Sequence, residues 1–167
     1  DDLKKIIQKY TPKSIINLAA FSNSKQCNIN SQKVFELNVN FVRKLAILCK
    51  ALRVKNFIHS SSEWVYGPGP INIKYKIPPQ YLYHKDLDLY SRSKLDAELL
   101  LLNIPLGEMN IFINRYGIIY GNKENKSNCV VDYILEKFIN KKEIDIRSVQ
   151  SGRSFISVND VIEFLYK

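Results

Sequence analysis

Glycine is scarce in this chain of 167 residues, and its distribution is uneven. All six glycines lie after residue 66. No Gly-x-x-Gly-x-x-Gly turn, the motif that seats a pyrophosphate at a helix N-terminus, therefore occurs anywhere in the sequence.

Cysteine is scarce as well. Cys27, Cys49 and Cys129 are far apart, and no Cys-x-x-Cys or Cys/His ligand spacing occurs. This absence argues against a zinc site, so we predict no metal. Free thiols are typical of a reducing compartment, and we therefore expect a cytoplasmic protein.

Long apolar runs are absent too. No stretch approaches the roughly 18 residues that a membrane span requires, so we expect no membrane partner. The N-terminus shows no signal-peptide pattern. It begins Asp1-Asp2-Leu3-Lys4, and we expect such a start to be the interior of a longer protein.

Arginine supplies only 6 of the 25 basic residues, although the net charge is +9. Lysine-rich charge scattered along the chain is weak support for base readout, because arginine makes the commonest specific base contacts. We therefore do not expect nucleic acid as the main partner. An anionic small molecule is the simpler partner for a basic chain.

Apolar periodicity predicts helices that alternate with short apolar strands. The helices are expected at residues 3–10, 32–52, 130–140 and from Asn159 onward, and a further helix is expected to open at Asp86 or Asp88 and to carry residues 90–101. The strands are expected at 14–20, 55–60 and 110–116, with short extended pieces at 144–147 and 154–158. Residues 21–30 and 67–85 are expected to be loop. This alternation predicts an α/β fold with a parallel sheet, in which ligands bind at the carboxyl ends of the strands.

The segment from His59 to Lys94 carries the clearest chemistry. Three serines, 60 to 62, leave an apolar strand, and Tyr90 and Lys94 then stand four residues apart on one face of a predicted helix. A lysine ammonium beside a phenol lowers the pKa of the phenol from about 10. Together with a serine hydroxyl, this is an acid/base device for oxidising an alcohol or reducing a ketone. The alternatives are an exposed helical pair and serines that merely cap a turn.

Six segments in order carry a family resemblance: Ile15 to Ala20; Asn38-Val39-Asn40 with Leu45 to Ala51; Val54 to Gly67; Tyr90 to Lys94 with Glu98; Arg115 to Gly121; and Gly152 to Val161. In this order they resemble the extended short-chain dehydrogenases/reductases, the group of nucleotide-sugar epimerases, dehydratases and reductases. A Tyr-x-x-x-Lys pair alone arises often by chance, whereas six ordered matches are specific.

The resemblance implies roles for individual residues. It implies that Tyr90 is the acid/base, that Ser62 binds the substrate oxygen, and that Lys94 binds the nicotinamide ribose and holds down the Tyr90 pKa. The residues that it implies touch NAD or NADP are Ala19, Ala20, Asn38, Ser60, Tyr90, Lys94 and Tyr116. The residues that it implies touch the nucleotide sugar are Glu63 and Arg153, of which Arg153 would contact the diphosphate.

Departures from the family pattern bear on the subtype. Dehydratases carry an acidic pair after the catalytic hydroxyl, whereas here Glu63 is followed by Trp64. Many epimerases place Asn where Ile118 stands. These two departures favour a 4-keto-sugar reductase similar to the dTDP-4-dehydrorhamnose reductases, with a 4-epimerase of the same family as the alternative.

The resemblance implies a Rossmann-like parallel sheet with flanking helices that lacks the N-terminal Gly-rich half and the end of the substrate lobe. We assign residues 1–122 to the C-terminal part of a dinucleotide-binding domain. Residues 123–167 are assigned to the start of a substrate lobe with a returning strand and helix. The residue that separates NAD from NADP follows a strand missing from the sequence. A homodimer is a further partner that we consider.

Two readings from other classes stay open. One is a truncated family member that binds a partner or a nucleotide without turnover, and the other is a basic binding module. For single residues, the structural alternatives are a surface ion pair for Arg153, a solvated turn for Glu63 and a core strand position for His59.

Overall fold

The computed structural model describes residues 2–22, 24–67, 87–105, 107–121, 130–145 and 152–166. The chain forms two compact units, Asp1–Arg115 and Tyr116–Lys167. The helices of the first unit are α1 (Asp2–Tyr10), α2 (Ser24–Ile29), α3 (Ser31–Phe35), the π-helical segment Glu36–Asn40, α4 (Phe41–Ala51), the 3-10 turn Glu63–Tyr66 and α5 (Leu89–Asn103). Its strands are β1 (Ser14–Asn17), β2 (Asn56–Ser62) and β3 (Asn110–Tyr116). Tyr116, the last residue of β3, belongs to the second unit.

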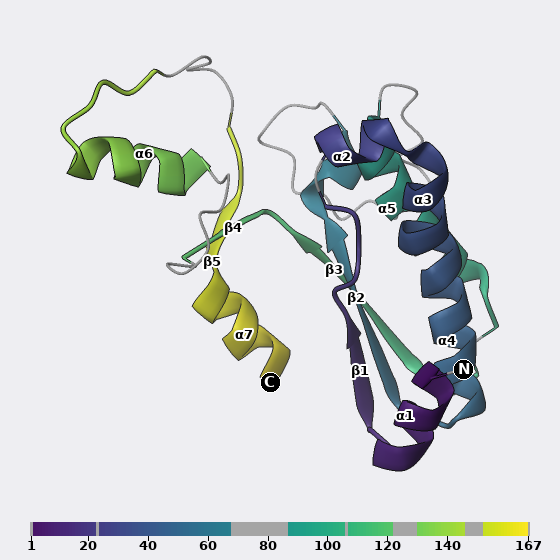
Figure 1. Ribbon diagram of the computed structural model, residues 1–167. Coiled ribbons are helices and arrows are strands. Elements are labelled where there is room, and N and C mark those ends of the chain that lie inside the picture. The colour runs from purple at the N-terminus through teal and green to yellow at the C-terminus, as the bar shows by residue number, and fades with distance from the viewer. Residues whose placement is uncertain are drawn as a thin grey trace. The chain divides into compact units, whose positions relative to one another are not determined.

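The three strands form one sheet in the order β1-β2-β3 (Figure 1). Strands β1 and β2 are parallel, with Ser14 opposite Asn56 and Asn17 opposite His59. At the start of β3, the backbone N–H of Asn110 donates to the carbonyl of Lys55 over 2.8 Å. The predicted α/β fold with a parallel sheet and flanking helices is confirmed.

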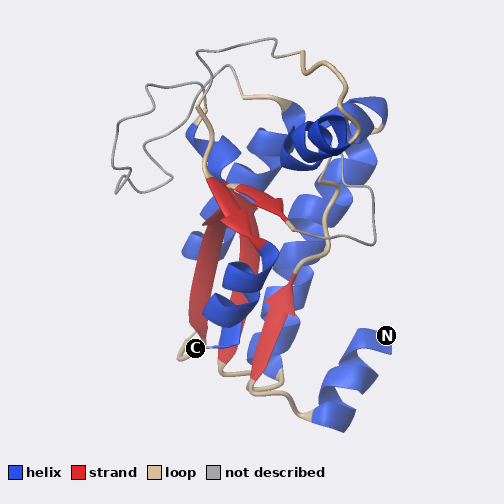
Figure 2. Cartoon of the chain, turned by 90° about the vertical axis from the view of Figure 1, so that its left-hand side faces the viewer, coloured by secondary structure: helices blue, strands red, loops and turns tan. Residues whose placement is uncertain are grey.

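Helices α4 and α5 cover one face of this sheet, as Figure 2 also shows. Because side chains alternate along a strand, Phe57, His59 and Ser61 of β2 all point to that covered face and are buried. On the opposite face the apolar side chains of Ile16 and Phe112 stay 43% and 49% exposed. The covered face therefore holds the core and, at His59 and Ser61, buried polar groups of the first unit.

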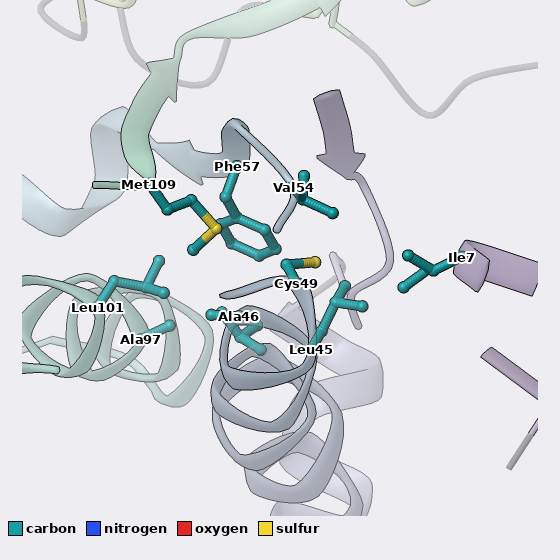
Figure 3. Close-up of a cluster of buried hydrophobic side chains, with 10 residues drawn as sticks. Ile7, Leu45, Ala46, Cys49, Val54, Phe57, Ala97, Leu101 and Met109 are labelled. Carbon is teal, nitrogen blue, oxygen red and sulfur yellow. The ribbon is translucent and has the colours of Figure 1, made fainter. Parts of the chain in front are cut away.

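The hydrophobic core lies between β2 and the two helices. Its buried members are Ile7, Val42, Leu45, Ala46, Cys49, Val54, Phe57, Ala97, Leu101 and Met109. Figure 3 shows Phe57, Leu101 and Met109 pointing toward Ala46 and Cys49 of α4. This packing holds the sheet, α4 and α5 together as two layers.

Several expected elements differ in detail. Residues 21–30, expected as loop, contain the short helix α2. The helix expected at 32–52 is interrupted by the π-helical segment, which widens the turn around Asn38. The strand expected at 14–20 ends at Asn17, and the helix expected to begin after Asn159 begins at Val158. Its N-terminal cap is Ser157, whose hydroxyl accepts from the N–H of Asp160 over 3.0 Å.

The second unit contains β4 (Ile118–Tyr120), α6 (Val130–Ile139), β5 (Phe155–Ser157) and α7 (Val158–Tyr166), and β4 pairs with β5 in parallel. Gly117 fits beside β5 because it has no side chain: a Cβ there would lie 2.4 Å from the carbonyl oxygen of Ser154. Among the described residues of this unit, Val161 alone is buried. Cys129 and most of the loop expected at 67–85 lie outside the described residues.

No helix in the described ranges is long and apolar enough to cross a membrane.

Candidate active site

The first turn of α5 presents Tyr90. Asp88 caps this helix: its carboxylate accepts from the N–H of Ser91 over 2.8 Å and from the Ser91 hydroxyl over 2.5 Å. An acidic cap satisfies N–H groups that the first turn leaves unpaired, which explains why the helix begins at this point. Tyr90 is thereby fixed in the first turn, with Lys94 one turn later on the same face.

Lys94 is buried, with only 4% of its surface exposed. Its Nζ donates to the carbonyl oxygen of Ser60 over 2.8 Å, so the ammonium lies against the carboxyl end of β2. Burial lowers the pKa of Lys94 to about 8, against the opposing effects of Glu98 and then Cys27. The side chain therefore keeps a proton at neutral pH, although less firmly than a lysine in water.

Ser62 ends β2 and faces the Tyr90 hydroxyl. Burial raises the pKa of Tyr90, and a side-chain hydrogen bond with Ser62 opposes that rise. The expectation that Lys94 lowers the pKa of Tyr90 does not hold in this structure, because burial is the largest influence and the Lys94 ammonium is turned to the Ser60 carbonyl. The spacing argument found the right neighbours but could not weigh the burial of the ring.

Two side chains follow Ser62 directly. The Ser62 hydroxyl accepts from the N–H of Trp64 over 3.3 Å and so caps the 3-10 turn. Trp64 is 43% exposed, whereas the Oε1 atom of Glu63 is buried without a hydrogen-bond partner among the described residues. This oxygen is not solvated, and the predicted contact of Glu63 with the substrate stays a prediction.

Asn38 links this site to the loop after β1. Its Oδ1 accepts from the N–H of Phe21 over 2.8 Å, and its Nδ2 donates to the Phe21 carbonyl over 3.1 Å and to the Ser93 hydroxyl over 2.9 Å. Ser93 in turn donates to the carbonyl of Tyr90 over 2.8 Å. Both N–H groups of the buried amide are thus occupied by the chain itself, and Asn38 acts as a strut that ties the loop to α5. The predicted contact of Asn38 with the cofactor stays a prediction.

The loop after β1 carries the two predicted cofactor contacts Ala19 and Ala20. The N–H of Ala19 donates to Oδ1 of Asn17 over 3.3 Å, which turns the chain at the strand end. Ala19 is exposed and Ala20 is partly exposed. Small exposed side chains at the carboxyl end of a parallel strand allow a ligand to approach the backbone closely.

Beneath Ser62 and Lys94 lies a layer of buried polar groups for which no part in the site was predicted from the sequence. Glu98 is fully buried and forms an ion pair of 2.7 Å with Arg115 at the end of β3. Its carboxylate also accepts from the Ser61 hydroxyl. The sequence offered two signals for Glu98: its position four residues after Lys94, and its place in a segment that carries the family resemblance.

His59 belongs to the same layer. Its Nδ1 lies 3.4 Å from the amide nitrogen of Asn17, while no partner for Nε2 occurs among the described residues. Burial, and after it the Lys94 charge, lowers the pKa of His59 to about 3. The ring is therefore neutral at physiological pH, as expected for a core strand histidine.

Tyr116 and Arg153 belong to the second unit. Tyr116 ends β3, and Arg153 is exposed, with its Nη1 donating to the Gly152 carbonyl over 2.9 Å. Their predicted contacts with cofactor and substrate stay predictions. The first unit by itself contains Ser62, Tyr90 and Lys94, the residues expected to carry the chemistry, and Ser60, an expected cofactor contact.

Comparison with known proteins identifies one family and its relatives. The profile of the NAD dependent epimerase/dehydratase family matches residues 1–167. A dTDP-D-glucose 4,6-dehydratase of Dictyostelium discoideum is 25% identical over 169 residues, which cover 96% of this chain and 39% of the dehydratase.

Solved structures share the fold. A UDP-glucuronic acid 4-epimerase of Bacillus cereus in complex with NAD has a TM-score of 0.80 at 22% identity, over 99% of this chain and 51% of that one. A UDP-glucose 4-epimerase of Thermotoga maritima has a TM-score of 0.77 at 21% identity, over 97% of this chain and 53% of that one. The chain thus spans about half the length of these solved structures, and less than half of the curated relative.

Proposed function

Because this chain belongs to the NAD-dependent epimerase/dehydratase family, we propose that the protein carrying it performs NAD-dependent oxidation and reduction at carbon 4 of a nucleoside-diphosphate sugar. The observation that carries the proposal is the arrangement at the end of β2. The Ser62 hydroxyl meets the Tyr90 hydroxyl, and the Lys94 ammonium is buried one helical turn further on.

The residues present fit a nicotinamide riboside. An ammonium has three N–H donors, and among the described residues Lys94 uses one of them, toward the Ser60 carbonyl. Two donors remain for ribose hydroxyls, and the exposed Ala19 leaves the end of β1 open to close approach. NAD, when bound there, supplies the ring carbon that takes up and returns a hydride.

Tyr90 handles the proton of the reaction. When the sugar alcohol is oxidised, its hydroxyl proton passes to the Tyr90 phenolate, and when a ketone is reduced, the Tyr90 hydroxyl gives the proton back. Ser62 donates to the same sugar oxygen and holds it in line with Tyr90. Burial raises the pKa of Tyr90, and the hydrogen bond with Ser62 is the contact that favours the phenolate.

Two finer outcomes are compatible with this chemistry. Epimerisation is supported by the relatives of known fold, which include 4-epimerases that act on UDP-sugars. Reduction of a 4-keto sugar is supported by Glu63 and Trp64, which replace the acidic pair of the dehydratases. We favour epimerisation and keep the reductase as the second candidate.

An NMR assay separates the two. The protein is incubated with UDP-glucuronic acid, UDP-glucose or dTDP-glucose and NAD, and the sugar products are identified by their proton couplings. Epimerisation yields the C4 epimer with no net NADH. A reductase yields none, but consumes NADH when a 4-keto nucleotide sugar is supplied. If NAD and nucleotide sugars bind and no sugar is converted under either condition, the proposal is wrong and the non-catalytic binding protein is supported.

A further inference from the structure

Glu98 lies one helical turn after Lys94, on the same face of α5, with none of its side chain exposed. A carboxylate so far from water is stable only when it is paired and hydrogen-bonded. The role of this buried charge can therefore be inferred from the groups that pair with Glu98.

The partners come from both strands that pack against the helix. Arg115 of β3 grips the carboxylate with two nitrogens: Nε lies 3.1 Å from both oxygens, and Nη2 lies 2.7 Å from Oε2. Ser61 of β2 donates its hydroxyl to Oε1. The guanidinium of Arg115 also stacks 4.7 Å from the ring centre of Tyr66, in the turn after Ser62. One carboxylate thus connects α5, the ends of two strands and the turn between the serines and Gly67.

Ser61 lies between Ser60 and Ser62, the two residues that contact Lys94 and Tyr90. The carbonyl of Ser60 accepts from Lys94, and the hydroxyl of Ser62 meets that of Tyr90. Because successive side chains of a strand point to opposite faces, fixing the Ser61 side chain also fixes the orientation of its neighbours. Glu98 therefore fixes the end of β2, residues 60–62, without contacting the hydroxyl of Ser62 or of Tyr90.

We propose that Glu98 is a positioning residue for the acid/base pair: its carboxylate anchors the end of β2 through Ser61 and supplies the negative charge that keeps Lys94 an ammonium. The inference rests on the proposed function for the roles of Tyr90 and Lys94.

The electrostatics around Lys94 agree with this assignment. The titratable groups that interact electrostatically with Lys94 are Glu98 of α5, Cys27 of α2 and His59 of β2. Asp88 and Tyr90 lie next to Cys27, and Arg115 pairs with Glu98. Among these neighbours, Glu98 has the largest effect that raises the pKa of Lys94. His59 is neutral, and burial raises the pKa of the Cys27 thiol, so neither supplies a negative charge near pH 7.

The charge is tested by measuring the pKa of Lys94 in protein labelled with ¹³C at lysine Cε, with the signal assigned through Lys94→Arg. Glu98→Gln keeps the shape and the acceptor for Ser61 but removes the charge. We expect the pKa of Lys94, about 8 in the native chain, to fall by about one pH unit or more. Asp96→Asn, which removes a carboxylate two residues earlier on the same helix, is the matched control and should leave it unchanged. An unchanged Lys94 pKa in Glu98→Gln overturns the assignment of the charge.

The anchoring is tested with Ser61→Ala, which keeps the charge of Glu98 and removes its contact with β2. We expect the Lys94 pKa to stay within about half a pH unit of the native value, while turnover falls by about tenfold or more with little change in KM. Native turnover in this variant overturns the anchoring role. If Glu98→Gln does not fold, Glu98→Asp replaces it: the retained charge should keep the Lys94 pKa near the native value and the shorter reach should reduce turnover. A Lys94 pKa that falls in this charged variant overturns the assignment of the charge.

The two measurements also separate this inference from the proposed function. The Lys94 titration needs no nucleotide, so a protein without any turnover still reports whether Glu98 holds the charge. A shifted Lys94 pKa in an inactive protein supports the charge assignment and contradicts the proposed function. Turnover with an unshifted Lys94 in Glu98→Gln contradicts the charge assignment alone.

Discussion

The two halves of α5 pack against the same face of the same sheet, yet they differ in the side chains that they bury. The N-terminal half buries Ser91, Ser93 and Lys94 as well as the apolar Leu95, and Glu98 continues the polar stripe. The C-terminal half buries Leu101, which packs with Phe57 in the hydrophobic core. The change occurs between Glu98, which bonds Ser61 of β2, and Leu101, which packs in the core with Phe57 of the same strand.

The difference separates the part of α5 that stabilises the core from the part that carries the proposed site. Burial of apolar surface stabilises the C-terminal half by roughly 25 cal/mol per Å². Burial of Lys94 is unfavourable by itself, and the lowered pKa of its ammonium records that penalty. We therefore expect substitutions in the apolar half to change the free energy of unfolding most, and substitutions in the polar half to change pH dependence and turnover.

The largest effect on stability is expected at Leu101. It is fully buried in the core, and Leu101→Ala should lower the free energy of unfolding by about 3 kcal/mol because it leaves a cavity. Leu102, the next residue, is 52% exposed, and Leu102→Ala is the matched control with an expected loss below about 1 kcal/mol. Urea denaturation of both variants measures the difference, and equal losses would contradict the assignment of the core to this half of the helix.

A smaller and pH-dependent effect is expected at His59. Because its folded pKa is lowered to about 3, the unfolded chain binds the proton first, and stability falls as the pH drops from about 6.5 toward 3. Between pH 7 and pH 5 this amounts to about 2 kcal/mol. His59→Gln should remove that part of the acid sensitivity while the carboxylates contribute equally in both proteins. Parallel stability curves for the two proteins would show that His59 is not buried in its neutral form.

Asn38 should matter less for stability than Leu101. Asn38→Leu keeps the volume but leaves the N–H and carbonyl of Phe21 without their partner, a loss of about 1–2 kcal/mol. Asn40, whose amide bonds only the exposed Glu36 over 2.8 Å among the described residues, provides the control, and Asn40→Ala should cost less than about 0.5 kcal/mol. Thermal denaturation of both variants tests the role of Asn38 as a strut, which equal midpoints would exclude.

The smallest effect is expected at Asp96. Burial raises the pKa of this half-buried carboxyl, against the opposing charge of Arg92, so the ionised form is less stable in the folded chain than in water. Because the folded pKa is raised, this penalty is present at pH 7 and disappears as the pH falls below the unfolded value. Asp96→Asn should therefore leave stability unchanged or raise it by less than about 1 kcal/mol at pH 7. A clear loss in chemical denaturation would show that Asp96 has a stabilising partner.

The sequence predicted the sheet and the main helices well because their signals are local. The run before Asn17, the cap at Asp88 and the periodicity of α4 each depend on neighbouring residues. The helix α2 was missed because six polar-rich residues carry no apolar period. The π-helical segment was missed because the widened turn depends on the contact of Asn38 with Phe21, a residue far away in the sequence.

The candidate site also has some features that local sequence signals predict and others that depend on contacts between distant segments. The spacing of Tyr90 and Lys94 is local, and the structure places Ser62 beside them. The buried pair of Glu98 and Arg115, and the neutral His59, depend on which side chains of three separate elements meet. The direction of the Tyr90 pKa likewise follows from burial of the ring, which no spacing rule measures.

The most direct test of the central claim is the rate of sugar conversion in Tyr90→Phe, compared with Tyr10→Phe, whose ring is 67% exposed on α1. If the polar half of α5 carries the acid/base chemistry, Tyr90→Phe lowers kcat by about 10²–10⁴-fold while Tyr10→Phe stays at the native rate. Equal rates in the two variants would contradict the assignment of Tyr90 and, with it, the proposed site.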